Sequence, residues 1–373
     1  MQVMTVLDQS PASPNDRART MCVGLFAAPE LPAQIAVDLA EQLPELLDRH
    51  HDGRWAVALA EERLLAGRES VEEILDAGCQ ARSAEGWDAA ICLTDVPLRD
   101  GARPLVAAVN RHERVAVVNV PAFGATLLKP RVRKAAVALI GDIAEEALEG
   151  RNQLKGRRPT EVLTPIRRET APDARAEVRY VMPAGLGHIR LLSGMVRANR
   201  PWRAFSGLSS AVVAAFGTGA YALLSTSIWQ LSGELGWPRL GAIMLCAVTA
   251  MVAWLIIGHR LWEKAENGKP RKDAALYNAA TALTLGVAVL CGYAAMFVLL
   301  LGVGALLIED GVFKDNAGHA AGIGAYAALA WLGAAIGTVA GALGSKLENI
   351  DEVRHATYGH NQCRRRESTG SER

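Results

Sequence analysis

Four long apolar runs in the second half of the chain are the strongest constraint on its fold. They cover residues 204–230, 240–257, 275–308 and 320–345, and none contains a charged residue or a histidine. A helix of about 20 apolar residues is long enough to cross the hydrocarbon core of a bilayer. A single run of this kind also occurs in buried helices of soluble proteins. Four in succession predict four transmembrane helices.

Basic residues between the runs indicate the direction of the predicted spans. The loop between the second and third runs holds the basic residues Arg260, Lys264, Lys269, Arg271 and Lys272. The other two loops, 231–239 and 309–319, hold one each. Cytoplasmic loops are enriched in Lys and Arg. We therefore expect a multi-pass plasma-membrane protein with cytoplasmic N- and C-termini and a cytosolic basic tail at residues 346–373.

The composition of the runs bears on what the spans do. Ion-coupled transporters usually keep an ionisable group at membrane depth, and these runs have none. The fourth run instead has small residues at helical spacing, namely Ala330, Gly333, Gly337 and Gly341. This spacing lets helix backbones approach closely. We expect it to serve packing within the bundle, and a homodimer seam is the alternative.

Residues 21–150 alternate between the patterns of strands and helices. Short apolar runs predict strands at residues 21–27, 55–59, 88–93, 104–110 and 115–120. Ser70 and Glu73 form a capping-box pattern at the start of a helix, and a further helix is expected at about 130–148. The predicted fold class is a cytosolic α/β domain with a mixed sheet, followed by an all-α four-helix transmembrane domain.

Two polar segments flank the predicted α/β domain. Residues 1–20 have the composition of a flexible leader, and residues 151–203 form a connector with twelve basic and four acidic residues. A polybasic segment beside a span is attracted to anionic lipids of the inner leaflet. Acidic residues outnumber basic ones by 23 to 15 in residues 1–150. Ion pairing with the α/β domain is therefore the alternative for some of the connector's charges.

Thr94 and Asp95 are the first candidate site residues. They follow the predicted strand at 88–93, and ligands of α/β folds bind at the carboxyl ends of strands. The alternative is that both residues only shape the turn that follows.

A second candidate site lies before the predicted helix at 130–148. Gly124 and Thr126 precede this helix, and Lys129 and Arg131 begin it. Backbone N–H groups at a helix start, together with basic side chains, can hold an anion or a lipid phosphate. A solvated or membrane-facing basic cluster is the alternative.

Several kinds of site have no signal in the sequence. The chain has no GxxxxGK[ST] phosphate loop, no GxGxxG after a strand, no GxSxG elbow and no HExxH. His50 and His51 fit a turn better than a metal site, and the six cysteines are scattered singly. No aromatic-rich basic face suggests nucleic-acid binding. We therefore expect no metal, no cofactor and no nucleic-acid partner.

Three segments carry a resemblance to known proteins. They are GLFAAPELP (residues 24–32), GWDAAICLTDVPLR (86–99) and VAVVNVPAFGA (115–125). With them the chain resembles a group of uncharacterised actinobacterial membrane proteins that join an N-terminal α/β domain to C-terminal transmembrane helices. Some relatives are labelled methylenetetrahydrofolate dehydrogenase, whose YxxxK pairing and Gly-rich nicotinamide loop are missing here.

The α/β domain also resembles archaemetzincin-type folds more loosely. In those metallopeptidases an LTD strand end and a VxVV strand precede a zinc-binding helix. The corresponding helix here, AAVALIGDIAEEAL at residues 135–148, has no histidine. This resemblance implies the fold without its metal.

Three functions remain open from the sequence. The favoured hypothesis is a non-enzymatic, membrane-anchored protein whose cytosolic α/β domain binds a ligand or a partner. The alternative is an enzyme at the membrane surface, with Asp95 as acid or base and Lys129 and Arg131 holding an anionic substrate. The third is a small channel or transporter made of oligomerised bundles.

Overall fold

The fold consists of two compact units, an α/β unit that ends at Ala198 and a helical unit that begins at Asn199. The computed structural model describes residues 20–50, 54–60, 68, 70–147, 166–170, 175–199, 209–262, 271–318 and 322–344. The predicted leader up to residue 19, the first part of the connector and the predicted basic tail lie outside the described residues.

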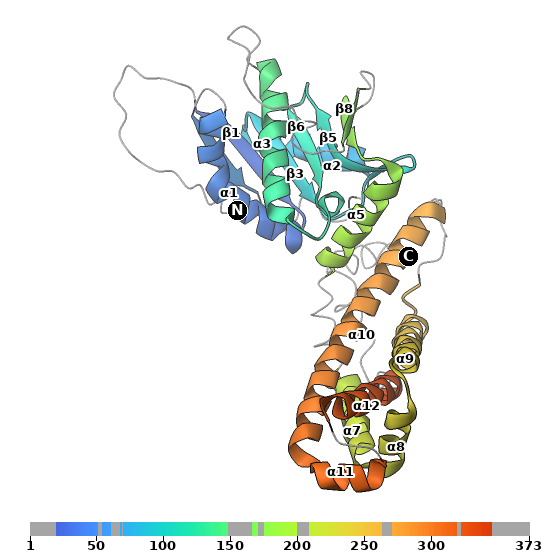
Figure 1. Cartoon of the computed structure of the whole chain (residues 1–373). Helices are drawn as coiled ribbons and strands as arrows, with labels where there is room; N and C mark the ends of the chain where they lie inside the picture. Colours follow the sequence, from blue (N-terminus) through green and yellow to red (C-terminus); the bar gives the residue numbers. More distant parts are fainter. Residues whose placement is uncertain are drawn as a thin grey trace. The chain divides into compact units, whose positions relative to one another are not determined.

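One mixed eight-stranded sheet forms the centre of the α/β unit (Figure 1). Its strands are β1 (Met21–Ala27), β2 (Trp55–Leu59), β3 (Ala89–Thr94), β4 (Arg99–Asp100), β5 (Arg103–Asn110), β6 (Val115–Asn119), β7 (Arg167–Thr170) and β8 (Val178–Val181). They lie in the order β2-β1-β3-β6-β5-β8-β7, and β4 pairs with β5. Strands β2, β1, β3 and β6 run parallel, whereas β5, β8 and β7 pair antiparallel. The predicted mixed sheet is confirmed.

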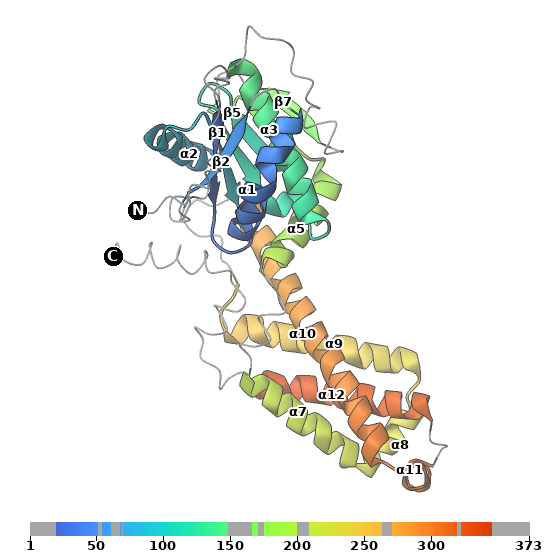
Figure 2. The same cartoon turned by 90° about the vertical axis from the view of Figure 1, so that its left-hand side faces the viewer.

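Helices cover both faces of this sheet. They are α1 (Leu31–His50), α2 (Val71–Glu85), α3 (Leu128–Ala147) and α5 (Ala184–Ala198), and a 3₁₀ helix, η2 (Val120–Phe123), follows β6. Figure 2 shows α1 and α3 on one face and α2 on the other. Strands β3 and β6 are buried at every residue, as expected of strands covered on both sides. The predicted capping box starts α2, where the Glu73 N–H donates to Ser70 Oγ.

The α/β unit is larger than the predicted domain at residues 21–150, because parts of the connector belong to it. Strand β8 pairs with β5, and β7 pairs with β8. The Tyr180 hydroxyl on β8 donates to Asp142 of α3 over 2.8 Å, and Arg111 and Arg168 form ion pairs with the same carboxylate. Burial and the negative charge of Asp142 raise the pKa of Tyr180. This network ties the connector strands to α3.

The helical unit contains the apolar runs. Its helices are α7 (Ser209–Leu224), α8 (Thr226–Glu234), α9 (Trp237–Gly258), α10 (Arg271–Leu307), α11 (Asp310–Ala317) and α12 (Ile323–Gly344). Three helical segments are long and apolar enough to cross a membrane, which are α9, residues Ala274–Leu307 of α10, and α12. These segments indicate a membrane protein.

The first predicted span, at residues 204–230, is not one straight helix. Helices α7 and α8 meet at an angle of 84°, with Ser225 between them. The Trp229 indole N–H donates to the Leu223 carbonyl over 2.7 Å, so it provides a partner for an acceptor at the end of α7. Backbone groups within a bilayer need such internal partners. The described residues therefore hold three straight candidate spans, or four if the bent pair is counted.

Aromatic side chains hold the short helices α8 and α11 together. The Trp229 ring stacks on Phe313 with centroids 5.4 Å apart, and Phe313 lies 5.1 Å from the Tyr326 ring of α12. The Tyr326 hydroxyl lies 2.9 Å from both the Ile308 carbonyl oxygen and an Asp310 carboxylate oxygen. These contacts fix α8 and α11 against one end of α12.

Helix α12 is the central helix of the unit, and its small residues face α7. A Cβ on Gly337 would lie 2.5 Å from the Ala215 carbonyl oxygen, and one on Gly341 would lie 3.0 Å from that of Ala211. Gly333 also faces α7, since a Cβ there would be in ordinary contact with the Gly219 carbonyl oxygen at 3.6 Å. Ala330 is buried. In an apolar 18-residue segment of α12, 67% of the residues are buried, whereas in the corresponding segments of α9 and α10 28% are buried. The glycine face of α12 is thus occupied within the chain.

We predict that Gly337→Ala destabilises the helical unit. The new Cβ overlaps the Ala215 carbonyl, and overpacking of this kind costs about 1–3 kcal/mol. The matched control is Gly286→Ala on α10, where a Cβ meets nothing within 4 Å. Thermal unfolding of the full chain in detergent is expected to show a lower Tm for Gly337→Ala alone. An equal Tm for the two variants would contradict the packing described here.

Candidate functional site

The carboxyl edge of the parallel strands contains a topological switch point between β1 and β3. The chain leaves β1 toward β2 on one side and leaves β3 toward β5 and β6 on the other. Ligands of open α/β sheets bind in the crevice at such a point. Here the Ala28 N–H donates to the Leu93 carbonyl over 2.8 Å. The ends of β1 and β3 are therefore joined by a backbone hydrogen bond.

Thr94 and the residues after it form a braced turn. The Val96 N–H donates to Thr94 Oγ1 over 3.1 Å. Asn119, the register partner of Thr94 on β6, is fully buried and donates its amide N–H groups to the carbonyls of Leu98 and Leu105. Thr94 thus has a structural role in shaping the turn. The sequence did not single out Asn119 as a structural residue of this turn. The one feature that could have indicated it is a polar residue at the end of an otherwise apolar strand.

Asp95 lies directly after β3 and is partly buried. It occupies the position where a catalytic acid or base at the switch point was expected. Its place in the braced turn is equally consistent with the structural alternative.

Gly124 is the point where α5 meets the loop before α3. It has φ +82° and ψ −177°, a conformation that is essentially restricted to glycine. A Cβ on Gly124 would lie 2.9 Å from Cγ of Arg190. One turn further along α5, a Cβ on Gly194 would lie 1.9 Å from the Pro121 carbonyl oxygen of η2. Helix α5 therefore packs directly on the segment that follows β6.

This packing brings Arg190 of α5 close to Arg131 of α3. Arg131 donates to the Phe123 carbonyl over 3.0 Å, and Arg190 contacts the Met182 sulfur at 3.7 Å. Burial and the positive charge of Arg131 lower the pKa of Arg190. Both side chains are partly exposed, and neither has an acidic partner in the part of the chain that the structure describes.

The other two residues of the predicted anion site have different environments. Lys129 forms an ion pair with Asp38 of α1. Thr126 is exposed in the loop before α3. The structure therefore brings together only Gly124 and Arg131 of the predicted set and adds Arg190, which lies 59 positions beyond Arg131. No local pattern in the sequence links these two arginines.

Three basic residues of the connector pair with acidic residues of the α/β unit. Arg179 donates to Asp100 over 3.0 Å, Arg175 donates to Asp76 over 2.6 Å, and Arg168 lies 3.5 Å from Asp142. For these three residues the structure shows the alternative considered above, ion pairing with the α/β unit, rather than charge left free for anionic lipid. Arg190 is the connector residue that remains without such a pair beside the candidate site.

Two guanidinium groups beside the first turn of a helix form a site that can bind an anion. Arginine forms strong charge-assisted hydrogen bonds to phosphate and carboxylate, so the two guanidinium groups are the donors of this site. The first turn of α3 adds few donors, because Pro130 has no N–H and the Arg131 N–H donates to the Leu127 carbonyl over 3.2 Å. Among the described residues no group of His, Cys, Asp and Glu has the arrangement of a metal site; His50 ends α1, and His51 lies outside those residues. Comparisons with protein-family models, curated proteins and solved structures found no match.

We predict that Gly124→Ala costs more stability than Gly86→Ala. Gly86, after α2, also has a positive φ of 68°, but a Cβ there meets nothing within 4 Å. Alanine in this left-handed conformation costs about 1–2 kcal/mol. Gly124→Ala adds a clash with Arg190, so its Tm in full-length protein is expected to fall further. An equal fall in Tm for the two variants would contradict the close packing of α5 on Gly124.

Proposed function

We propose that the chain is a four-span membrane protein whose cytosolic α/β unit binds an anionic ligand or partner at Arg131 and Arg190. The role is that of a binding or regulatory module rather than an enzyme. Three straight candidate spans and the bent α7–α8 pair support the membrane part of this proposal. The observation that carries the binding part is the arginine pair without an acidic partner among the described residues.

The proposed topology places both termini and the loop between α9 and α10 in the cytoplasm. That loop region carries Arg260, Lys264, Lys269 and Arg271, whereas the α8 and α11 connections hold few basic residues. This bias is the one expected of cytoplasmic loops. On this topology α8 and α11 lie at the outer end of the bundle, and the α/β unit lies in the cytoplasm.

Reporter fusions test this topology. Alkaline phosphatase, which is active only outside the cytoplasm, is expected to be active when fused after Gly236 or Gly318. It is expected to be inactive when fused after Lys264. Activity at Lys264, or inactivity at both outer positions, would contradict the proposed orientation.

Anion binding follows from the cost of bringing two positive charges together. Like charges repel, and an anion between them removes that repulsion and accepts hydrogen bonds from both groups. Thr94 and Asn119 both contribute to the turn after β3: Thr94 Oγ1 accepts from the Val96 N–H, and the Asn119 N–H groups donate to the Leu98 and Leu105 carbonyls. Lys129 is paired with Asp38. Among these edge residues, Arg131 and Arg190 are the two whose charge is not balanced by an acidic neighbour.

We predict that Arg190→Gln weakens anion binding roughly tenfold or more. Loss of one charge-assisted hydrogen bond costs about 1.5–3 kcal/mol. The measurement is calorimetric titration of the full chain, in phosphatidylcholine nanodiscs, with inorganic pyrophosphate. Arg131→Gln is expected to have a similar effect.

The matched control for this titration is Lys134→Gln. Lys134 is exposed on α3, and the structure gives it no ion pair among the described residues. Its loss removes the same charge without touching the arginine pair, so the affinity is expected to change little. No binding by the unmodified protein, or equal weakening in all three variants, would refute the proposed site.

A further inference from the structure

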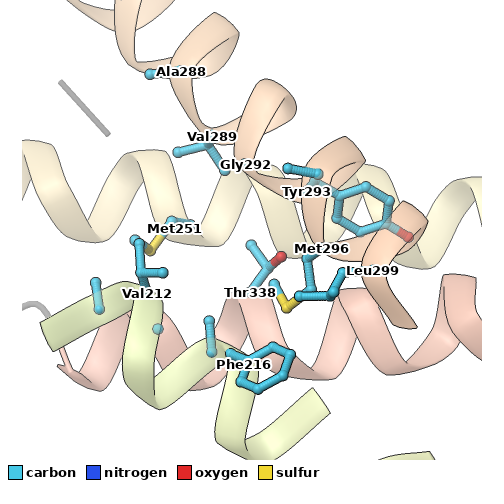
Figure 3. Close-up of a pocket in the computed structure, with 14 residues that line it drawn as sticks. Val212, Phe216, Met251, Ala288, Val289, Gly292, Tyr293, Met296, Leu299 and Thr338 are labelled. Carbon is cyan, nitrogen blue, oxygen red and sulfur yellow. The ribbon is translucent and has the colours of Figure 1, made fainter. Parts of the chain in front are cut away.

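An apolar cavity of about 240 Å³ lies within the helical unit. Figure 3 shows Val212 and Phe216 of α7 facing Val289 and Met296 of α10 across it. Helix α9 contributes Met251, and α12 contributes Thr338 and Gly341. The cavity therefore lies among all four helices that the proposed function places in the membrane.

The lining offers no free polar group to a ligand. Its two hydroxyl groups are both engaged: Thr338 donates to the Ala334 carbonyl over 2.8 Å, and Tyr293 donates to the Trp331 carbonyl over 2.7 Å. The remaining lining residues are apolar. A cavity of this chemistry does not retain water but can take an apolar molecule.

Small residues on α10 leave this space unfilled. Ala288, Gly292 and Ala295 recur at helical spacing along the side of α10 that lines the cavity. Such residues usually let two helices approach closely. Here α12 already packs against α7 through its glycines. The cavity lies between α7 and α10 beside the place where Met296 and Leu300 of α10 reach Gly219 of α7. The spacing between α7 and α10 therefore leaves room for another molecule beside the residues that the structure describes.

The rim of the cavity is continuous with the exposed apolar surface of the spans. Phe216 is 40% exposed and Leu299 is 48% exposed, while the inner residues Met251 and Val289 are less than a tenth exposed. On α10 the rim continues into Val298, which is 66% exposed. If the spans lie in a bilayer, this surface faces lipid chains. The cavity then opens directly into the hydrocarbon.

We propose that the cavity binds the acyl chain of a membrane lipid, inserted between α7 and α10. This inference rests on the proposed membrane function. It goes beyond that function because it assigns a specific lipid site, separate from the arginine pair. The chain is held by apolar contact with the lining, and the polar headgroup remains outside the cavity.

The first test uses the full chain in liposomes that contain a phosphatidylcholine with a diazirine in its acyl chain. After illumination, mass spectrometry locates the labelled residues. We expect label on the buried Met251 and Val289, and also on the exposed Val298. Label on Val298 without label on Met251 and Val289 would overturn the lipid site. Absence of label from Val298 as well would instead count against the proposed membrane span.

The second test fills the cavity. Ala288→Phe places a ring on the inner wall, and Ala295→Phe places one at the exposed rim, where the fold is less sensitive to added volume. Both are expected to lower labelling of Met251 and Val289 at least fivefold, with labelling of Val298 retained. The control is Ala294→Phe, because Ala294 is exposed and does not line the cavity. Unchanged labelling in both filled variants, or an equal loss in the control, would overturn the proposal.

Discussion

The close backbone contact between α7 and α12 is the constraint on which the helical unit depends. Gly337 permits it, because any side chain there would meet the Ala215 carbonyl. The contact makes α12 the buried helix of the unit, with α9 and α10 more exposed around it. In a bilayer, helices gain no hydrophobic energy by leaving lipid, so close packing of this kind is a main source of their association. With α12 committed to α7, space remains between α7 and α10, and this space is the apolar cavity.

In the α/β unit, glycines likewise let a helix pack closely against a neighbouring backbone. Gly194 lets α5 rest on the Pro121 carbonyl of η2, and Gly124 supplies a backbone conformation that fits beneath Arg190. These contacts position α5 beside the start of α3. Arg190 therefore lies next to Arg131, although the connector that carries it was expected to lie outside the domain. The candidate anion site is a consequence of helix packing rather than of a local motif.

Much of the fold could be predicted from the sequence where a local signal exists. The apolar runs at 21–27 and 55–59 are strands with those bounds, and the capping box at Ser70 starts α2. The apolar runs at 104–110 and 115–120 correspond to β5 and β6, which pair antiparallel. The bend at Ser225 was missed, because neither proline nor charge interrupts the apolar run there.

The candidate site could be predicted only in part, for a related reason. A glycine and basic residues before a helix indicated Gly124 and Arg131. The partner of Arg131 depends on long-range packing, which leaves no periodic trace in the sequence. Similarly, the pairing of β8 with β5 joins residues about 70 positions apart, so the connector's place in the sheet had no local signal.

Disulfide cross-linking between α7 and α12 tests the central contact most directly. A Cβ on Gly333 would lie 3.8 Å from the Cβ of Ala222, which is within the range of a disulfide. With the native cysteines replaced by alanine, the double variant Ala222→Cys/Gly333→Cys is predicted to oxidise within one chain and to remain monomeric on a non-reducing gel. A dimer formed by Gly333→Cys alone, with no intramolecular cross-link in the double variant, would show that the glycine face meets a second copy and would contradict the account.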